Sequence, residues 1–217
     1  EIAQCLVGSE MCIRDRITSE FEQLAQILEK IDPKTIKDAD LRARYYYLKG
    51  FEMVFNQAPF TDVLFHFDQL LMSKTTDTVF QLLAYTGIGI AYAREAELEK
   101  AEVYFDKVFS EIYTYPIQTT EDIWRVLNIV FHCGVFYAQT NDLETSNALL
   151  NYAIAICSEN HLTYYLARAA AQLAKNAQAA GEPASVILEL IQDALAFAKI
   201  NKNRLLINEL NQMKKQL

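Results

Sequence analysis

Apolar residues recur at helical spacing along almost the whole chain from Ile17 onward. Ser19 and Glu22 have the spacing of a capping box, which predicts that a first helix begins at about Ser19 and ends near Asp32. No segment alternates apolar and polar positions for long enough to favour a strand. The four prolines, which helix interiors do not tolerate, fall between the periodic segments: Pro33, Pro59, Pro116 and Pro183. The pattern therefore predicts about ten helices, in pairs joined by short turns.

A repeat underlies these helices. Residues at fixed offsets from Gly89 match in size those at the same offsets from Gly134: Tyr85, Tyr92, Ala101, Phe105 and Val108 in one unit, Val130, Tyr137, Ser146, Leu150 and Ala153 in the other. The small residues should let two antiparallel helices approach closely, while Phe105 and Leu150 fill the space beside them. An N-terminal unit fits after a one-residue insertion, and a fourth fits without one: Tyr46, Gly50, Met53, Val63, Phe67 and Leu70, then Ala170, Ala174, Ala177, Val186 and Leu190, with Gly181 in its turn.

The unit anchored on Gly89, which is the second along the chain, resembles the tetratricopeptide repeat (TPR) family. It reads Tyr85-x-x-Ile88-Gly89-x-x-Tyr92 followed by Ala101-x-x-x-Phe105-x-x-Val108. The anchor glycines lie 39 and 45 residues apart, where the family period is about 34, so longer helices are expected. The resemblance covers about Arg42 to Ile200. It implies an all-α fold, a right-handed TPR-like α-solenoid of antiparallel helix pairs with a concave inner face.

Residues 1 to 16 stand apart from this pattern. From Leu6 to Arg16, all eleven residues match one translated frame of a transposase adapter used in sequencing. We therefore interpret residues 1–16 as a non-native, adapter-derived segment and residues 17–217 as the TPR-like repeat domain. On this interpretation the native protein extends further upstream.

Composition narrows the function classes. The chain has 217 residues, of which 52% are hydrophobic, and a formal charge of −8. No apolar run approaches the roughly 18 residues of a membrane span, and the negative charge makes a poor nucleic-acid surface. Outside residues 1–16 only Cys133 and Cys157 remain. Both lie in apolar helical settings, so we expect buried free thiols and a cytoplasmic protein without a membrane partner.

A second resemblance follows from the run Leu41-Arg42-Ala43-Arg44-Tyr45-Tyr46-Tyr47-Leu48-Lys49-Gly50, which comes after Leu28-Glu29-Lys30-Ile31-Asp32-Pro33. These residues resemble the C-terminal part of Firmicutes peptide-pheromone-sensing transcriptional regulators of the Xre type. The resemblance implies quorum sensing: an N-terminal helix-turn-helix binds DNA, and the repeats bind a short signalling peptide. No helix-turn-helix is visible here, and residues 1–16 lie where it would join. We further expect a homodimer formed through the C-terminal helices.

In such a solenoid the first helix of each pair lines the concave face. The corresponding positions combine apolar residues with sparse polar groups, and the candidate peptide-binding residues are Arg44, Tyr47, Phe51, Thr86, Arg94, Asn128, Phe131, Gln139, Arg168, Lys175 and Gln178. The amides would pair with a peptide backbone, and a cation would take a carboxylate. Alternatively, the cations are ordinary solvated side chains of long helices. Of the adjacent tyrosines, Tyr46 is assigned to packing and Tyr47 to the groove.

Catalytic motifs are missing. His66, His132 and His161 lie on different predicted helices, without the spacing of a metal site. Gly87-Ile88-Gly89 lacks the third glycine of a nucleotide fingerprint, and no strand precedes it. We therefore predict a protein that is not an enzyme and has no cofactor or metal. The leading hypothesis is the peptide-sensing repeat domain of a helix-turn-helix regulator, and the alternative is a TPR protein–protein scaffold without a small ligand.

Overall fold

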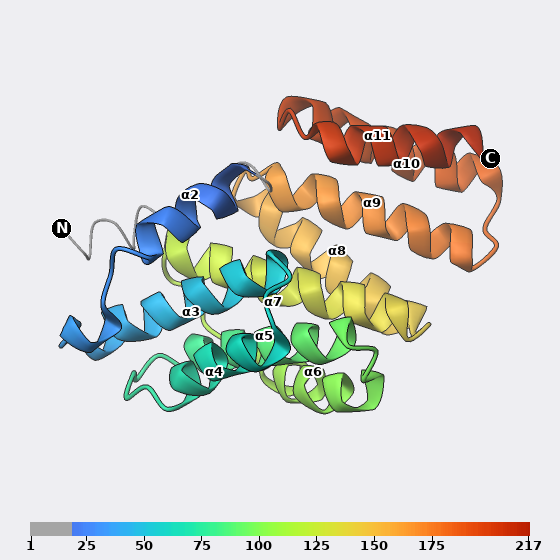
Figure 1. The fold of residues 1–217 in the computed structure, drawn as a ribbon. Coiled ribbons are helices and arrows are strands. Elements are labelled where there is room, and N and C mark those ends of the chain that lie inside the picture. Colours follow the sequence, from blue (N-terminus) through green and yellow to red (C-terminus); the bar gives the residue numbers. More distant parts are fainter. Residues whose placement is uncertain (1–18) are drawn as a thin grey trace. The chain divides into compact units, whose positions relative to one another are not determined.

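The computed structural model describes the backbone from Ser19 to Leu217 and the side chains from Leu24 onward (Figure 1). The adapter-derived segment assigned to residues 1–16 lies outside the described residues. So do the side chains of the capping box at Ser19 and Glu22, although the first described helix does begin at Ser19.

The described chain is all-helical, with ten α-helices packed in adjacent pairs, which confirms the predicted fold class. The helices are α2 (Ser19–Leu28), α3 (Ala39–Phe55), α4 (Phe60–Leu71), α5 (Val79–Arg94), α6 (Leu98–Ile112), α7 (Thr120–Gln139), α8 (Leu143–Glu159), α9 (Tyr164–Ala179), α10 (Ala184–Ile200) and α11 (Arg204–Lys215). A short 3-10 turn, η1 (Pro33–Thr35), follows α2. None of the described helices is long and apolar enough to cross a membrane.

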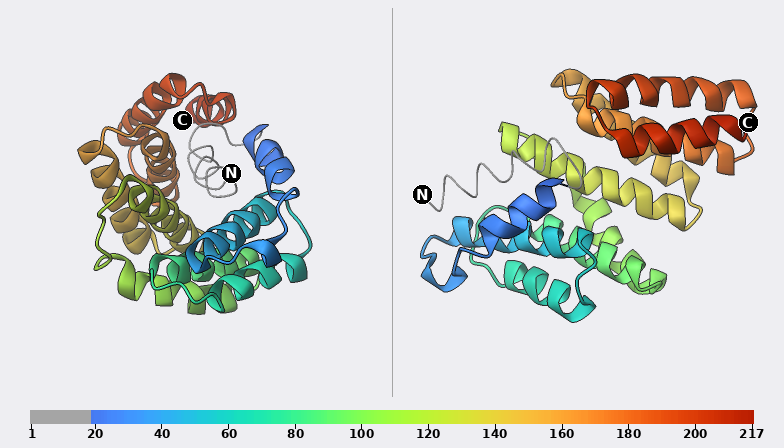
Figure 2. Two further views of the ribbon diagram at one scale, coloured as in Figure 1. Left: turned by 90° about the vertical axis from the view of Figure 1, so that its left-hand side faces the viewer. Right: turned by 45° about the horizontal axis from the view of Figure 1, so that its top comes forward.

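The chain divides into two compact units within α7, the first ending at Ile129 and the second beginning at Val130. In unit 1, α4 packs against both α3 and α5, and α6 packs against α5. In unit 2, α9 packs between α8 and α10, and α11 packs against α10, as the views in Figure 2 show. Each unit therefore contains antiparallel pairs of the TPR kind.

Close approach at the anchor glycines confirms the repeat inferred from the sequence. A Cβ atom added at Gly89 would lie 2.7 Å from the Phe105 ring, and one added at Gly134 would lie 3.0 Å from Leu150 Cγ. The same holds at Gly50, where the Phe67 ring would be 2.7 Å away. A larger residue at Gly50 or Gly89 would force the facing ring to move, and one at Gly134 would make an unusually tight contact with Leu150, so these positions favour glycine.

The turns inside the pairs explain one error of register. Three residues separate α5 from α6 and α7 from α8, whereas four separate α3 from α4 and α9 from α10. The longer turns end in Pro59 and Pro183 at the N-cap of the second helix. The fourth unit therefore has the same one-residue insertion as the first. Val186, predicted to be in the core, is 41% exposed, and Ile187 is buried in its place.

The two cysteines confirm the expectation of buried, free thiols. Burial raises the pKa of Cys133 far above its ordinary value and raises the pKa of Cys157 to about 12. Both thiols stay protonated near neutral pH, and reactivity belongs to the thiolate. They are packing residues rather than redox or metal-binding groups.

Candidate functional site

Three of the predicted groove residues in unit 1 are enclosed by neighbouring side chains. Phe51 is 1% exposed, and its ring meets Phe67 edge-on at 5.3 Å. Tyr47 is buried against Phe51 and Phe80. Thr86 is fully buried and donates its hydroxyl hydrogen bond to a backbone carbonyl one turn earlier, at 2.9 Å. These three side chains belong to the core in the structure, and none of them leaves a buried polar atom without a hydrogen-bond partner.

The three adjacent tyrosines of α3 differ in burial from what the sequence predicts. Tyr45 and Tyr47 are both buried, while Tyr46, assigned to packing, is only half-buried beside His66. Residues two positions apart project to nearly opposite sides of a helix. Helix α3 is therefore covered on two sides within unit 1. The face of α3 that is open to a ligand is narrower than the predicted concave face.

The two predicted cations of unit 1 are already engaged. Arg44 pairs with Glu121 at 3.9 Å. Arg94 donates from Nη2 to the carbonyl of Ala58 at 2.9 Å and pairs through Nε with Glu95 at 3.3 Å. Its Nη1 is buried without a hydrogen-bond partner among the described residues, but the adjacent carboxylate compensates its charge. Both arginines therefore serve the packing and the turns of unit 1.

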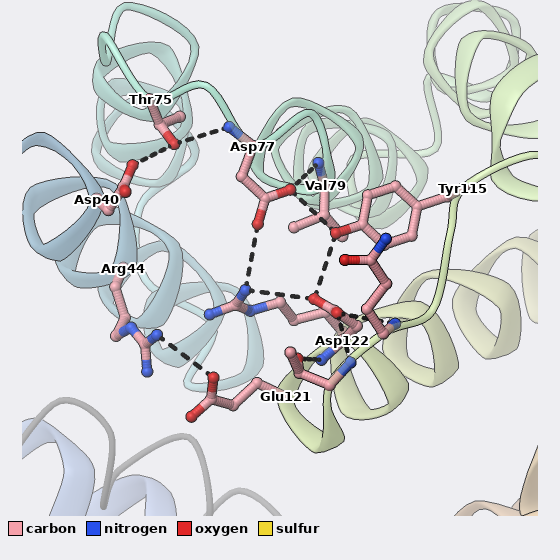
Figure 3. Close-up of polar contacts among 11 residues, drawn as sticks. Asp40, Arg44, Thr75, Asp77, Val79, Tyr115, Glu121 and Asp122 are labelled. Atoms are coloured by element: carbon pink, nitrogen blue, oxygen red, sulfur yellow. Dashed lines mark hydrogen bonds and ion pairs between the residues drawn. The ribbon is translucent and has the colours of Figure 1, made fainter.

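Asp77, Tyr115 and Asp122 form a polar network that the sequence argument missed (Figure 3), and Arg125 is its cation. Its Nη1 lies 3.5 Å from Asp77 Oδ2 and 3.9 Å from Asp122 Oδ1, and its guanidinium lies 4.6 Å from the centre of the Phe80 ring. The Tyr115 hydroxyl is within hydrogen-bond distance of both carboxylates, at 3.0 and 3.3 Å. Arg125 is 5% exposed, so its charge is compensated inside the protein by the two aspartates.

The same network fixes the ends of helices. Burial alone would raise the pKa of Asp122. Hydrogen bonds hold that pKa below its ordinary value, and they come from the side chain and N–H of Thr119, the N–H of Gln118 and the hydroxyl of Tyr115. Asp77 accepts from the Val79 N–H at 3.0 Å, at the start of α5. Asp77, Tyr115, Asp122 and Arg125 are among the residues that line a pocket of about 450 Å³. Thr119 and Asp122 have capping-box spacing, which is the sequence signal that would have revealed this cluster.

Asn128 lies one turn further along α7 and behaves differently. It is 4% exposed, and its Oδ1 is buried without a hydrogen-bond partner among the described residues. Most buried polar side-chain atoms in proteins have a partner, and leaving one without costs about 1–3 kcal/mol. This acceptor is therefore a candidate contact for a ligand.

In unit 2, Arg168 lies over a group of aromatic rings. Its guanidinium carbon is 4.4 Å from the centre of the Phe131 ring, 5.9 Å from that of Tyr164 and 6.0 Å from that of Tyr165. All three rings are buried. The neighbouring His132 is buried too, and this burial, reinforced by the charge of Arg168, lowers the pKa of His132 to about 3. The imidazole is therefore neutral at physiological pH.

The remaining predicted residues of unit 2 lie at the surface or close to it. Lys175 pairs with Glu209 of α11, while Gln139 and Gln178 are exposed at the ends of their helices. Beside Lys175, Asn176 is buried and donates to Ser146 Oγ and Asn147 Oδ1, both at 2.8 Å. Asn176 is a satisfied packing residue, which a sequence argument could not have told apart from Asn128.

Taken with the paired helices, these features define a TPR-like helical-repeat fold. No family model matches the chain, and no curated protein matches it. Among solved structures it is similar to PlcR of Bacillus thuringiensis, crystallised in complex with the peptide PapR7 and DNA. The TM-score is 0.76 at 12% identity, covering 99% of this chain and 73% of that chain. At this identity the likeness shows a shared fold.

Proposed function

We propose that this chain is the ligand-sensing repeat domain of a helix-turn-helix transcriptional regulator and that it binds a short peptide through its inner helices. The observation that carries the proposal is Asn128, a nearly enclosed amide whose oxygen has no partner among the described residues. Its position on α7 is one that the repeat assigns to the inner face.

An amide side chain is suited to this task because it offers the same groups as a peptide bond. Its oxygen accepts from a backbone N–H and its nitrogen donates to a backbone carbonyl, so one residue holds an extended peptide regardless of its side chains. The cost of leaving Oδ1 unpaired in the ligand-free protein is recovered on binding.

The shared fold supports the rest of the proposal. PlcR was crystallised with a peptide and with DNA. By analogy, this chain senses a signalling peptide in the cytoplasm, has no catalytic activity or cofactor, and belongs to a regulator that reaches DNA through a helix-turn-helix domain. Exposed apolar side chains near the C-terminus, Ile200 and Leu205, suit a homodimer interface.

The test is affinity selection. The full chain is incubated with a pool of synthetic random heptapeptides, and the peptides that co-elute with it are identified by mass spectrometry. We expect a small set of related peptides to be retained, and Asn128→Leu to lose them. The matched control is Asn211→Leu, which changes an exposed asparagine on α11. Retention of no peptide by the unmodified chain would refute the proposal.

A constitutive protein–protein scaffold is the second candidate, and exposed apolar side chains on α4, on α6 and at their C-caps favour it. The exposed side chains there are Phe65, Met72, Val103, Phe109 and Tyr113. A scaffold would retain no heptapeptide but would bind a folded partner protein. Its binding would be lost in Phe65→Ser and unchanged in Asn128→Leu.

A further inference from the structure

The structure separates the four predicted inner-face cations into two kinds. Arg44, Arg94 and Lys175 each pair with a carboxylate of this chain, from Glu121, Glu95 and Glu209 respectively. Arg168 has no ion pair and no hydrogen bond among the described residues. Its guanidinium instead makes cation–π contacts with aromatic rings. A guanidinium carries five N–H donors, so Arg168 retains its whole capacity for an anionic partner.

The geometry leaves those donors in a usable arrangement. A guanidinium stacked on an aromatic face keeps its N–H groups in its own plane, pointing away from the ring. The Arg168 guanidinium carbon lies 4.4 Å from the centre of the Phe131 ring, and no described residue accepts a hydrogen bond from its N–H groups. A planar fork of two parallel N–H groups matches a carboxylate, which it binds through two charge-assisted hydrogen bonds.

The surroundings preserve this preference for an anion. The rings of Phe131, Tyr164 and Tyr165 are buried, so the floor under the guanidinium is apolar and strengthens electrostatic attraction. His132 is the neighbouring titratable group, and in its neutral form it adds no charge to either side. The chain as a whole carries a formal charge of −8, which disfavours a polyanion such as nucleic acid more strongly than a single carboxylate.

We infer that Arg168, supported by Phe131, Tyr164 and Tyr165, is a subsite for a carboxylate group of the bound peptide. This inference rests on the proposed function, because it names a chemical group of the bound peptide. The carboxylate is either the C-terminus of the peptide or the side chain of an aspartate or glutamate in it.

Small probes test the subsite without any knowledge of the peptide. N-acetylphenylalanine carries a terminal carboxylate only, the α-amide of N-acetylglutamic acid carries a side-chain carboxylate only, and N-acetylphenylalaninamide carries neither. The readout is the Nε–Hε NMR signal of Arg168, assigned by its disappearance in Arg168→Lys. We expect a saturable shift with at least one acid at millimolar concentration and none with the neutral amide. Equal shifts with all three probes, or a shift with none, would overturn the inference.

The peptides retained in the selection provide the second test. Each is titrated into the full chain as its free acid, as its C-terminal amide, and with any Asp or Glu changed to Asn or Gln. We expect one of these neutralisations to weaken binding about tenfold or more, as charge-assisted hydrogen bonds require. Arg168→Gln should abolish the preference, Arg168→Lys should retain part of it, and Arg204→Gln, an exposed arginine on α11, should leave it intact.

The two tests separate the possible failures. If peptides are retained but every acid and its neutral form bind equally, the carboxylate subsite is refuted and peptide sensing stands. If no peptide is retained, peptide sensing is refuted, and the NMR titration alone decides whether Arg168 binds carboxylates. Urea unfolding of Arg168→Gln shows whether the variant is folded, and a folded variant with an unchanged acid preference also refutes the inference.

Discussion

The buried and half-buried arginines of the two units differ in whether a carboxylate of the protein compensates their charge. In unit 1, Arg125 is held between Asp77 and Asp122, and Arg44 is paired with Glu121. In unit 2, Arg168 rests on aromatic rings and has no carboxylate partner among the described residues. The charge of Arg125 is compensated within the protein, so this side chain has a structural role, whereas the N–H donors of Arg168 are not used by any described residue and can bind a ligand.

The contrast extends to the amides and shows how burial should be interpreted. Asn176 and Asn128 are both nearly enclosed, but Asn176 donates to two neighbours while Asn128 leaves its oxygen unpaired. Burial by itself therefore does not mark a packing role. The distinction lies in whether the hydrogen-bonding capacity of the buried group is used, because an unused group lowers stability until a ligand satisfies it.

The largest expected change in stability is the loss on replacing Arg125, and replacing Arg168 provides the comparison. Arg125→Leu leaves Asp77 and Asp122 facing each other without their cation, so we expect a loss of about 3–5 kcal/mol in the free energy of unfolding. Arg168→Leu removes only cation–π contacts and should cost about 1 kcal/mol or less. Urea unfolding followed by circular dichroism measures both. Equal losses in the two variants would contradict the division into structural and ligand-binding arginines.

The second effect is a pH dependence specific to unit 2. The pKa of folded His132 is about 3, and an unfolded histidine titrates near 6.5, so the unfolded chain binds a proton that the folded chain does not as the pH falls below 6.5. Stability therefore falls with decreasing pH, by about 2 kcal/mol from this group between pH 7 and pH 5. Unfolding titrations at the two pH values should show this difference reduced in His132→Gln.

A His132→Gln variant with the same pH dependence as the unmodified chain would mean that His132 is protonated in the folded state. The neutral surroundings proposed for Arg168 would then be wrong.

The smallest effect concerns the turn that closes a pair in each unit. Ala96 in unit 1 and Gly181 in unit 2 follow their helices with φ angles of 60° and 72°, in the left-handed region that favours glycine. Ala96→Gly should therefore raise the free energy of unfolding by about 1 kcal/mol, and Gly181→Ala should lower it by a similar amount. A Cβ at Gly181 would meet no atom within 4 Å, so only the backbone is tested there. Thermal unfolding measures both, and changes of the same sign would contradict the turn assignment.

Much of the fold could be predicted because it depends on local spacing. Prolines between periodic segments fixed the number of helices, and the anchors Gly89 and Gly134 revealed the repeat, since close helix packing requires a small residue opposite a large one. The one-residue shift at Val186 could not be found in this way. It depends on the length of the turn before α10, and both registers place apolar residues on one helix face.

The site was less predictable because it depends on which polar and charged side chains have a partner, and such partners come from contacts between residues. The inner-face positions were assigned from the repeat, but whether Arg94 or Arg168 has a carboxylate beside it depends on contacts with distant or neighbouring turns. Likewise, Tyr47 and Phe51 occupy inner positions in the repeat but are buried. The Arg125 network joins α5, α7 and the loop before α7, and only its capping-box spacing was visible in the sequence.

The most direct test of peptide sensing is a calorimetric titration of the selected peptide into the unmodified chain and into Asn128→Leu, with the unfolding free energy of both measured without peptide. Because leucine removes an unsatisfied buried acceptor, the variant should be as stable as the unmodified chain or about 1 kcal/mol more stable. It should also bind the peptide at least tenfold more weakly. A variant that is less stable yet binds the peptide with unchanged affinity would contradict the account, because Asn128 would then be a packing residue.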